Sequence, residues 1–165
     1  MSSTTDRIEK RIVLRAPQER VWRAVSDAAE FGRWFGMEVD GAFVAGASTR
    51  GRITPTAVDG DVAKVQEKYR GVPFELFVER VEPMSVFAFR WHPHATDPSV
   101  DYSREPMTLV TFFLEPLEDG TAVTITESGF DSIPIERRAT AFEANSGGWE
   151  TVAQLLDKYM ASRQP

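Results

Sequence analysis

The amino-acid sequence predicts an α+β domain in which a curved antiparallel sheet wraps a long C-terminal helix. Three observations predict it: an alternating apolar pattern near the N-terminus, a series of short strand-like segments in the middle, and a helical periodicity near the C-terminus. The chain has 165 residues, which is the length of one ordinary domain. We therefore interpret residues 1–165 as a single domain, with an ordered core over about 7–162.

The N-terminal region predicts a strand followed by two short helices. Apolar residues alternate over 8–15, which suits a half-buried strand. Pro17 is well placed in the first turn of a helix, and the apolar stripe after it predicts a helix over about 17–26. A second helical stretch covers 28–34.

The middle of the chain predicts six more strands. Several of its short segments are rich in β-branched and aromatic residues, and turn signals such as Asp59-Gly60 separate them. Short connections between successive strands imply an antiparallel sheet, so we expect about seven strands in all. The one long connection, 93–106, contains three prolines and is expected to be a loop. The six segments are 50–55, 61–69, 74–81, 84–91, 107–114 and 122–128.

The C-terminal region, from Ile135 to about Ala161, predicts one long helix. Apolar residues recur at steps of three, four or seven, and a helix of this length is able to cover the inner face of a twisted sheet. Gly147 and Gly148 interrupt the pattern, and each costs about 1 kcal/mol relative to alanine. We expect this pair to mark a kink or a close approach to the sheet. The stripe is Ile135, Ala139, Phe142, Trp149, Val152, Leu156 and Tyr159.

Composition excludes several classes of function. The formal charge of −6 argues against a nucleic-acid or anionic-membrane surface. The absence of cysteine excludes disulfides, thiolate metal sites and cysteine nucleophiles. The polar N-terminus and the lack of a long apolar window predict a cytoplasmic protein without membrane insertion.

Several short motifs, taken in their order and spacing, resemble the START-like (SRPBCC) superfamily. Residues 12–22, with their Ala-Pro and Val-Trp pairs, resemble the opening strand and helix of these domains, and 33–35 resemble the end of their second helix. The motifs at 120–121, 127–130 and 147–149 are similar to the last strands and the final helix of one branch. That branch is related to the C-terminal domain of the heat-shock protein 90 ATPase activator.

The resemblance covers about residues 8–159 and implies a helix-grip fold. It also implies binding of a small apolar or amphipathic molecule between the sheet and the C-terminal helix. Members of the superfamily include lipid carriers, hormone receptors and polyketide cyclases, so the resemblance does not imply one activity. The chain lacks the separate N-terminal domain of the eukaryotic chaperone activator, and we therefore do not expect a chaperone partner.

The candidate ligand-binding residues are mostly aromatic. For any single aromatic residue, packing in the core is the better interpretation, whereas the resemblance favours a cavity for the set. Glu127 is in phase with the apolar pair Val123 and Ile125, and we expect its side chain to point inward. Tyr69, Arg90 and Thr111 are further polar candidates, and Arg90 is a candidate partner for Glu67, Glu127 or a carboxylate ligand. The predicted ligand-binding residues are Trp34, Phe35, Phe43, Tyr69, Phe77, Phe89, Trp91, His92, Phe112, Glu127, Phe142 and Trp149.

The loop 93–106 has three interpretations. His92-Pro93-His94, followed by Asp97, Asp101 and Glu105, contains residue types that bind zinc, but this spacing is a weak signal. The blander interpretation is an ordinary loop, with His92 at the end of a strand near the cavity mouth and the carboxylates facing solvent. A middle interpretation, which we keep as a hypothesis, is a lid, including Tyr102, that gates access to the cavity. We predict no metal ligands and no cofactor.

Three functions remain open on the sequence. A small-molecule binding domain is favoured, because no Gly-x-Ser-x-Gly elbow or phosphate-binding loop is present. A cyclase-like or hydrolase-like enzyme would require polar groups such as Glu127, Tyr69, Arg90 or His92 to converge. A chaperone-interacting module would require an exposed apolar patch. A homodimer also remains open.

Overall fold

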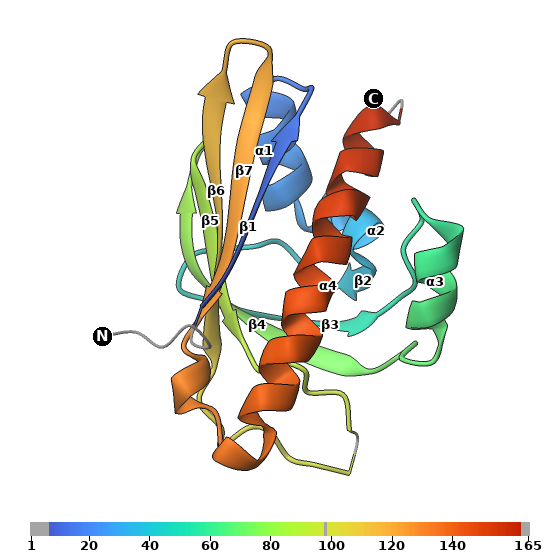
Figure 1. Ribbon diagram of the computed structural model, residues 1–165, viewed down its shortest axis with the longest axis vertical. Helices are drawn as coiled ribbons and strands as arrows, with labels where there is room; N and C mark the ends of the chain where they lie inside the picture. The colour runs from blue at the N-terminus through green and yellow to red at the C-terminus, as the bar shows by residue number, and fades with distance from the viewer. Residues whose placement is uncertain (1–6, 98, 163–165) are drawn as a thin grey trace.

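A seven-stranded antiparallel sheet curves around one long helix, as the sequence predicts (Figure 1). The computed structural model describes residues 7–97 and 99–162. The strand order is β1-β7-β6-β5-β4-β3-β2, and every neighbouring pair is antiparallel. The elements are β1 (Arg7–Leu14), α1 (Gln18–Ser26), α2 (Ala28–Phe35), β2 (Met37–Val39), β3 (Ser48–Ile53), α3 (Gly60–Glu67), β4 (Pro73–Glu82), β5 (Val86–Trp91), β6 (Thr108–Leu117), β7 (Gly120–Ser128), η1 (Phe130–Ser132) and α4 (Ile135–Ala161).

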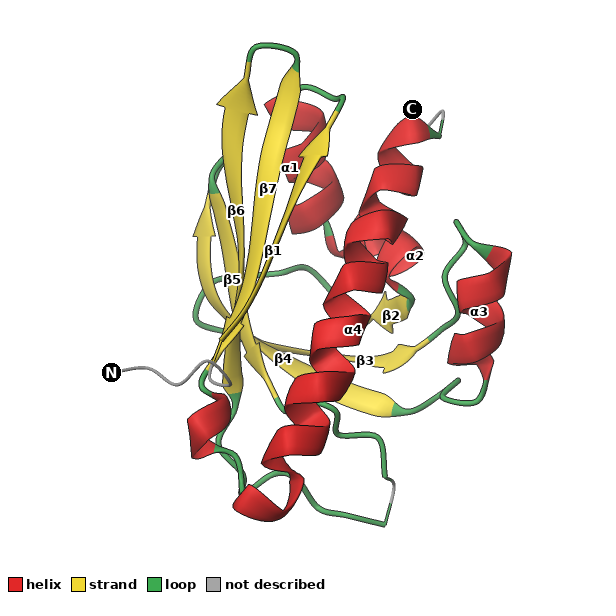
Figure 2. Ribbon diagram, in the orientation of Figure 1, coloured by secondary structure: helices red, strands yellow, loops and turns green. Residues whose placement is uncertain are grey.

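The sheet has one buried and one more exposed face because strand residues alternate. On β7, Val123, Ile125 and Glu127 are buried, and on β6 Phe112 is buried while its neighbour Phe113 is 41% exposed. The buried face is concave and lies toward α4. In the view of Figure 2, β3 and β4 cross behind this helix. The inward position of Glu127 agrees with its predicted phase.

Helix α4 has the predicted bounds, but its first turns do not follow the predicted stripe. Trp149, Leu156 and Tyr159 are buried, whereas Ile135 is 76% exposed. The helix is continuous through Gly147 and Gly148, and both lie at the surface with open space where a side chain would stand. The expected close approach to the sheet is therefore wrong, because the two glycines lie on the solvent side.

The predicted strand over 61–69 is wrong, because this segment forms helix α3. The Asp59 side chain accepts hydrogen bonds from the backbone N–H groups of Asp61 and Val62, at 2.9 and 3.0 Å, and so caps the helix. The apolar residues of this short segment fit a strand, whereas the cap favours a helix. The sheet still has seven strands, because the short strand β2, which the sequence did not indicate, pairs with β3.

An aromatic cluster fills the interior between the sheet and helix α2. Phe31 and Trp34 from α2 contact Phe112 of β6, with ring centroids 5.9 and 6.5 Å from its own. Phe43 and Phe87 pack at 4.8 Å. Interiors packed to this density leave little room for a ligand. A binding site is therefore not expected within this cluster.

Candidate functional site

A cavity of about 350 Å³ lies where the ends of β3, β4 and β5 meet the loop 92–107. Most of its wall comes from the sheet, the end of α2, the residues after α3, and the loop. Among the described residues, α4 contributes Asn145 alone, so the cavity lies beside the helix rather than along it. The lining residues are Phe35, Gly36, Met37, Ile53, Gln66, Tyr69, Val72, Pro73, Phe74, Glu75, Trp91, His92, His94, Ala95, Thr96, Tyr102 and Asn145.

The buried carboxylate of Glu127 lies next to this cavity and accepts four hydrogen bonds. Its Oε1 accepts from the indole N–H of Trp149 at 2.7 Å and from Nδ2 of Asn145 at 2.8 Å. Its Oε2 accepts from the indole N–H of Trp91 at 2.7 Å and from the hydroxyl of Thr108 at 2.6 Å. The side chain is 0% exposed. The four donors come from β5, β6 and α4, so Glu127 joins three elements to β7.

The pairing at Glu127 requires an acceptor at both carboxylate oxygens. Each oxygen receives one indole N–H, which is a donor and cannot accept. An ionised carboxylate is acceptor-only and satisfies both indoles, whereas an amide presents a donor at one end. The arrangement therefore selects glutamate over glutamine at this position, even though the two side chains have nearly the same shape.

This network fixes the inner wall of the cavity. Trp91 and Asn145 both line the cavity and both donate to Glu127. The Trp91 ring packs against Trp149 at 5.7 Å and against Phe35 at 6.2 Å. Donation to one carboxylate and aromatic packing together hold these side chains in one orientation. The wall is therefore preorganised.

Arg137, in the first turns of α4, holds the loop that forms the outer wall. Its Nε donates to Glu105 at 2.8 Å, and its Nη1 donates to the carbonyl of Pro93 at 2.9 Å. Its guanidinium also lies over the Tyr102 ring, 4.8 Å from the centroid. One side chain thus contacts both ends of the loop and its middle. The sequence does not indicate this role, because no local pattern reveals a partner so far away along the chain.

The two histidines beside the cavity are neutral at about pH 7. Burial lowers the pKa of His92; the carboxylate of Glu105 opposes this shift and Arg137 adds to it. Burial and then Arg137 lower the pKa of His94. Within the described part of the chain, no three histidine, aspartate or glutamate side chains lie close enough to hold a metal ion.

The predicted ligand-binding residues divide into four groups. Phe35, Tyr69, Trp91 and His92 line the cavity. Glu127 and Trp149 lie directly behind that wall, while Trp34, Phe43, Phe89 and Phe112 are packed in the core. Phe77 is half-buried on β4, and Phe142 packs against Phe130 at 5.2 Å, away from the cavity. A role for any of them in binding stays a prediction.

The other polar candidates do not converge. Arg90 pairs with Glu79 at 3.1 Å, and Glu67 pairs with Arg70 at 2.8 Å, so the proposed partnership of Arg90 with Glu67 or Glu127 is wrong. Residues that sequence reasoning missed include Gln66, which lines the cavity and donates to the carbonyl of Phe35 at 3.1 Å. It was missed because its segment had been interpreted as a strand.

Replacing Arg137 by glutamine is expected to loosen the loop. Each charge-assisted hydrogen bond that is lost is worth about 1.5–3 kcal/mol, so amide hydrogen exchange over 92–107 should accelerate by about tenfold or more. Hydrogen-exchange mass spectrometry measures this. The control is Arg138→Gln, because Arg138 donates to the carbonyls of Asp131 and Ile133 instead. Equal exchange in the two variants would show that Arg137 does not hold the loop.

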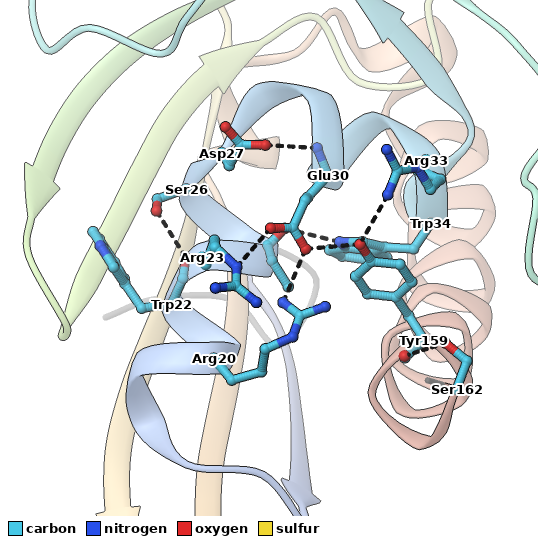
Figure 3. Close-up of polar contacts among 11 residues, drawn as sticks. Arg20, Trp22, Arg23, Ser26, Asp27, Glu30, Arg33, Trp34, Tyr159 and Ser162 are labelled. Atoms are coloured by element: carbon cyan, nitrogen blue, oxygen red, sulfur yellow. Dashed lines mark hydrogen bonds and ion pairs between the residues drawn. The ribbon is translucent and has the colours of Figure 1, made fainter. Parts of the chain in front are cut away.

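A second, partly buried polar cluster joins three helices at the other end of α4 (Figure 3). Glu30 of α2 accepts hydrogen bonds from Arg20 and Arg23 of α1, each at 2.9 Å, and from the hydroxyl of Tyr159 of α4 at 2.7 Å. Burial alone would raise the pKa of Glu30, but the Tyr159 hydroxyl and the two guanidinium groups outweigh it and lower the pKa. Burial and the bond to Glu30 raise the pKa of Tyr159. This cluster is a clamp on α4, distant from the cavity lining.

Comparison with known proteins agrees with this fold. The family model described as Activator of Hsp90 ATPase homolog 1-like protein matches residues 15–161. A search of curated proteins found no significant match.

None of the helices in the described residues combines the length and the apolar character that a membrane crossing requires.

Solved structures of similar fold show low sequence identity. DynU16, from the dynemicin biosynthetic locus, is 24% identical with a TM-score of 0.67; the match covers 97% of this chain and 49% of DynU16, so this chain spans about half of that protein. MLL2253 from Mesorhizobium loti is 23% identical with a TM-score of 0.67, over 96% of this chain and 98% of that one. The Aha1 dimer from Colwellia psychrerythraea is 19% identical with a TM-score of 0.64, over 93% and 95%. These likenesses show the helix-grip fold, and because the family model spans most of the sequence, the chain belongs to the activator of Hsp90 ATPase homologue 1-like family within the START-like superfamily.

Proposed function

We propose that the protein binds a small apolar or amphipathic molecule in the cavity at the ends of β3, β4 and β5. The observation that carries the proposal is a space of about 350 Å³ bounded largely by apolar and aromatic side chains. Sites for small molecules span roughly 300–1,000 Å³ and are mostly apolar with a few polar groups, so this cavity is at the small end of that range.

The construction of the wall supports this proposal. A protein interior is normally packed without large voids, and an unfilled space costs stability. Here the side chains that could collapse into the space are held back: Trp91 and Asn145 by Glu127, and Tyr102 by Arg137. A cavity that is maintained by specific bonds is expected where a molecule has to enter.

No specific observation favours the two alternatives. For an enzyme, the acid and base groups have to converge, whereas the acceptor positions of Glu127 are taken by four donors, and Arg90 pairs elsewhere. The occurrence of DynU16 in a biosynthetic locus fits a domain that handles small molecules. For a chaperone-interacting module, the exposed large apolar residues, such as Val13, Val65 and Ile135, lie on separate elements.

Filling the cavity tests the proposal. Ile53 lines it, while its neighbour Thr54 lines a different hollow of about 370 Å³ between α2, β2 and the segment that follows β3. We expect Ile53→Trp to weaken binding of the neutral dye N-phenyl-1-naphthylamine at least tenfold, because the indole occupies the space. Thr54→Trp should bind the dye like the parent protein. Dye titration followed by fluorescence measures both affinities.

Native mass spectrometry of protein purified without added ligand complements this titration. A co-purifying molecule that is retained by Thr54→Trp and lost from Ile53→Trp would identify the ligand directly. The proposal fails if the parent protein neither binds the dye nor retains any small molecule, or if both tryptophan variants bind as the parent does.

A further inference from the structure

We propose that the ligand carries no negative charge and donates a hydrogen bond, from a hydroxyl or N–H group, to Oδ1 of Asn145. This inference rests on the proposed function and specifies the chemistry of the molecule. It depends on two independent observations: the orientation that Glu127 imposes on the Asn145 amide, and the charges of the side chains around the cavity.

Glu127 determines which end of the Asn145 amide is available. Both oxygens of Glu127 accept hydrogen bonds from the donors around them, and the NH₂ group of Asn145 is the end of the amide that faces Oε1, at 2.8 Å. Rotating the amide by half a turn would bring its oxygen against Oε1 of Glu127, two acceptors without a proton between them. The amide oxygen is thereby directed away from Glu127.

The available end of Asn145 is an acceptor. Oδ1 accepts no hydrogen bond from any described residue, and Asn145 lines the cavity. Trp91, the other side chain that Glu127 holds in the wall, uses its indole N–H on Oε2 and offers the cavity an aromatic surface. The polar requirement at this wall is therefore a donor from the ligand.

The charges around the cavity disfavour an anion. No lysine or arginine is present among the described lining residues, and Glu75, which is present, is already paired with the exposed Arg50 at 3.3 Å. Of the cations that contact lining residues, Arg137 is already bonded to Glu105 and to the carbonyl of Pro93, and Lys68 lies over the ring of Tyr69 at 5.1 Å. The carboxylate of Glu127 lies behind the wall with no cation among its four partners. A carboxylate ligand would lose its water without gaining a counter-ion.

The two histidines do not supply the missing positive charge. Their pKa values are lowered by burial, so both are neutral at about pH 7. Fatty acids and other carboxylates are consequently poor candidates, whereas alcohols, phenols and amides with an apolar body are good ones.

Three probes that share one naphthalene ring separate these possibilities. They are 2-(2-naphthyl)ethanol, its methyl ether, which has lost the donor, and 2-naphthylacetate, which is an anion at about pH 7.5. Each is used to displace N-phenyl-1-naphthylamine from the parent protein. We expect the alcohol to bind about 2- to 12-fold more tightly than the ether, and the carboxylate to bind at least tenfold more weakly than the alcohol.

The variant Asn145→Leu keeps the side-chain size and removes the acceptor. In this variant the alcohol and the ether should bind with equal affinity, because position 145 no longer offers an acceptor to the hydroxyl group. The inference is overturned if the carboxylate binds the parent as well as the alcohol does, or if the ether matches the alcohol in the parent. Those two comparisons need no variant. Failure of the proposed function is a different result: neither the dye nor any naphthalene probe would bind.

Discussion

Replacing Glu127 by glutamine is expected to lower the free energy of unfolding by about 2–4 kcal/mol, although the two side chains have almost the same shape. Each oxygen of Glu127 accepts one indole N–H. Whichever way the new amide is turned, its NH₂ group faces either Trp91 or Trp149, and that indole loses its acceptor. A buried donor without an acceptor costs about 1–3 kcal/mol, and the remaining donors are left with a neutral amide oxygen in place of a carboxylate.

Urea unfolding followed by tryptophan fluorescence measures this loss. The matched control is Glu115→Gln on β6, which makes the same chemical change at an exposed position and should shift stability by less than about 0.5 kcal/mol. Because Trp91 and Asn145 would lose their common partner, Glu127→Gln should also weaken dye binding. Parent-like stability of Glu127→Gln would show that the four hydrogen bonds contribute little.

Replacing Glu30 by glutamine is expected to destabilise the protein by about 2 kcal/mol at neutral pH, and by much less in acid. The pKa of Glu30 is lower in the folded protein than its ordinary value of 4.5. A carboxyl group whose pKa is lowered by folding stabilises the native state above its unfolded pKa, and that contribution disappears as pH falls through the folded pKa. The stability difference between the parent and Glu30→Gln should therefore be constant above about pH 5 and shrink below about pH 4.

Urea unfolding of both proteins at several pH values measures this difference. Tyr159→Phe provides an independent check, because it removes the hydroxyl donor from the same carboxylate and should reproduce part of the loss. The control is Glu19→Gln, at an exposed position in the first turn of α1. A difference that stays unchanged from neutral to acid pH would contradict the assigned role of Glu30 as the charged centre of the clamp.

The fold was predictable where local patterns and tertiary packing agree. The first strand, the two short helices after it and the bounds of α4 follow from periodicity, and the inward phase of Glu127 follows from alternation along its strand. The segment 61–69 was not predictable by the same means. Its apolar content fits a strand, but the cap at Asp59 and the bond from Gln66 to the carbonyl of Phe35 favour a helix.

The candidate site was less predictable because its contacts join distant parts of the chain. Phe35, Tyr69, Trp91 and His92 were predicted and do line the cavity, yet nothing near Asn145 in the sequence indicates that Glu127 is its partner. The same holds for Arg137, whose partners lie 32 or more residues before it. Several predicted aromatic residues belong to the core instead, since alternation identifies the inner face without separating filled from empty space.

The two exposed glycines of α4 lie between Asn145 and Trp149, the two side chains through which the helix is bonded to Glu127. Glycine is the residue type, proline apart, that least favours helical geometry. The turn of α4 that bends most easily thus lies between the two side chains that are hydrogen-bonded to Glu127. On the N-terminal side of this turn, Arg137 is bonded to the loop 92–107. On the C-terminal side, Tyr159 is bonded to Glu30. Bending at this turn would displace the N-terminal part of α4 together with the loop that forms the outer wall of the cavity. The C-terminal part of the helix, which is bonded to Glu30, would stay in place.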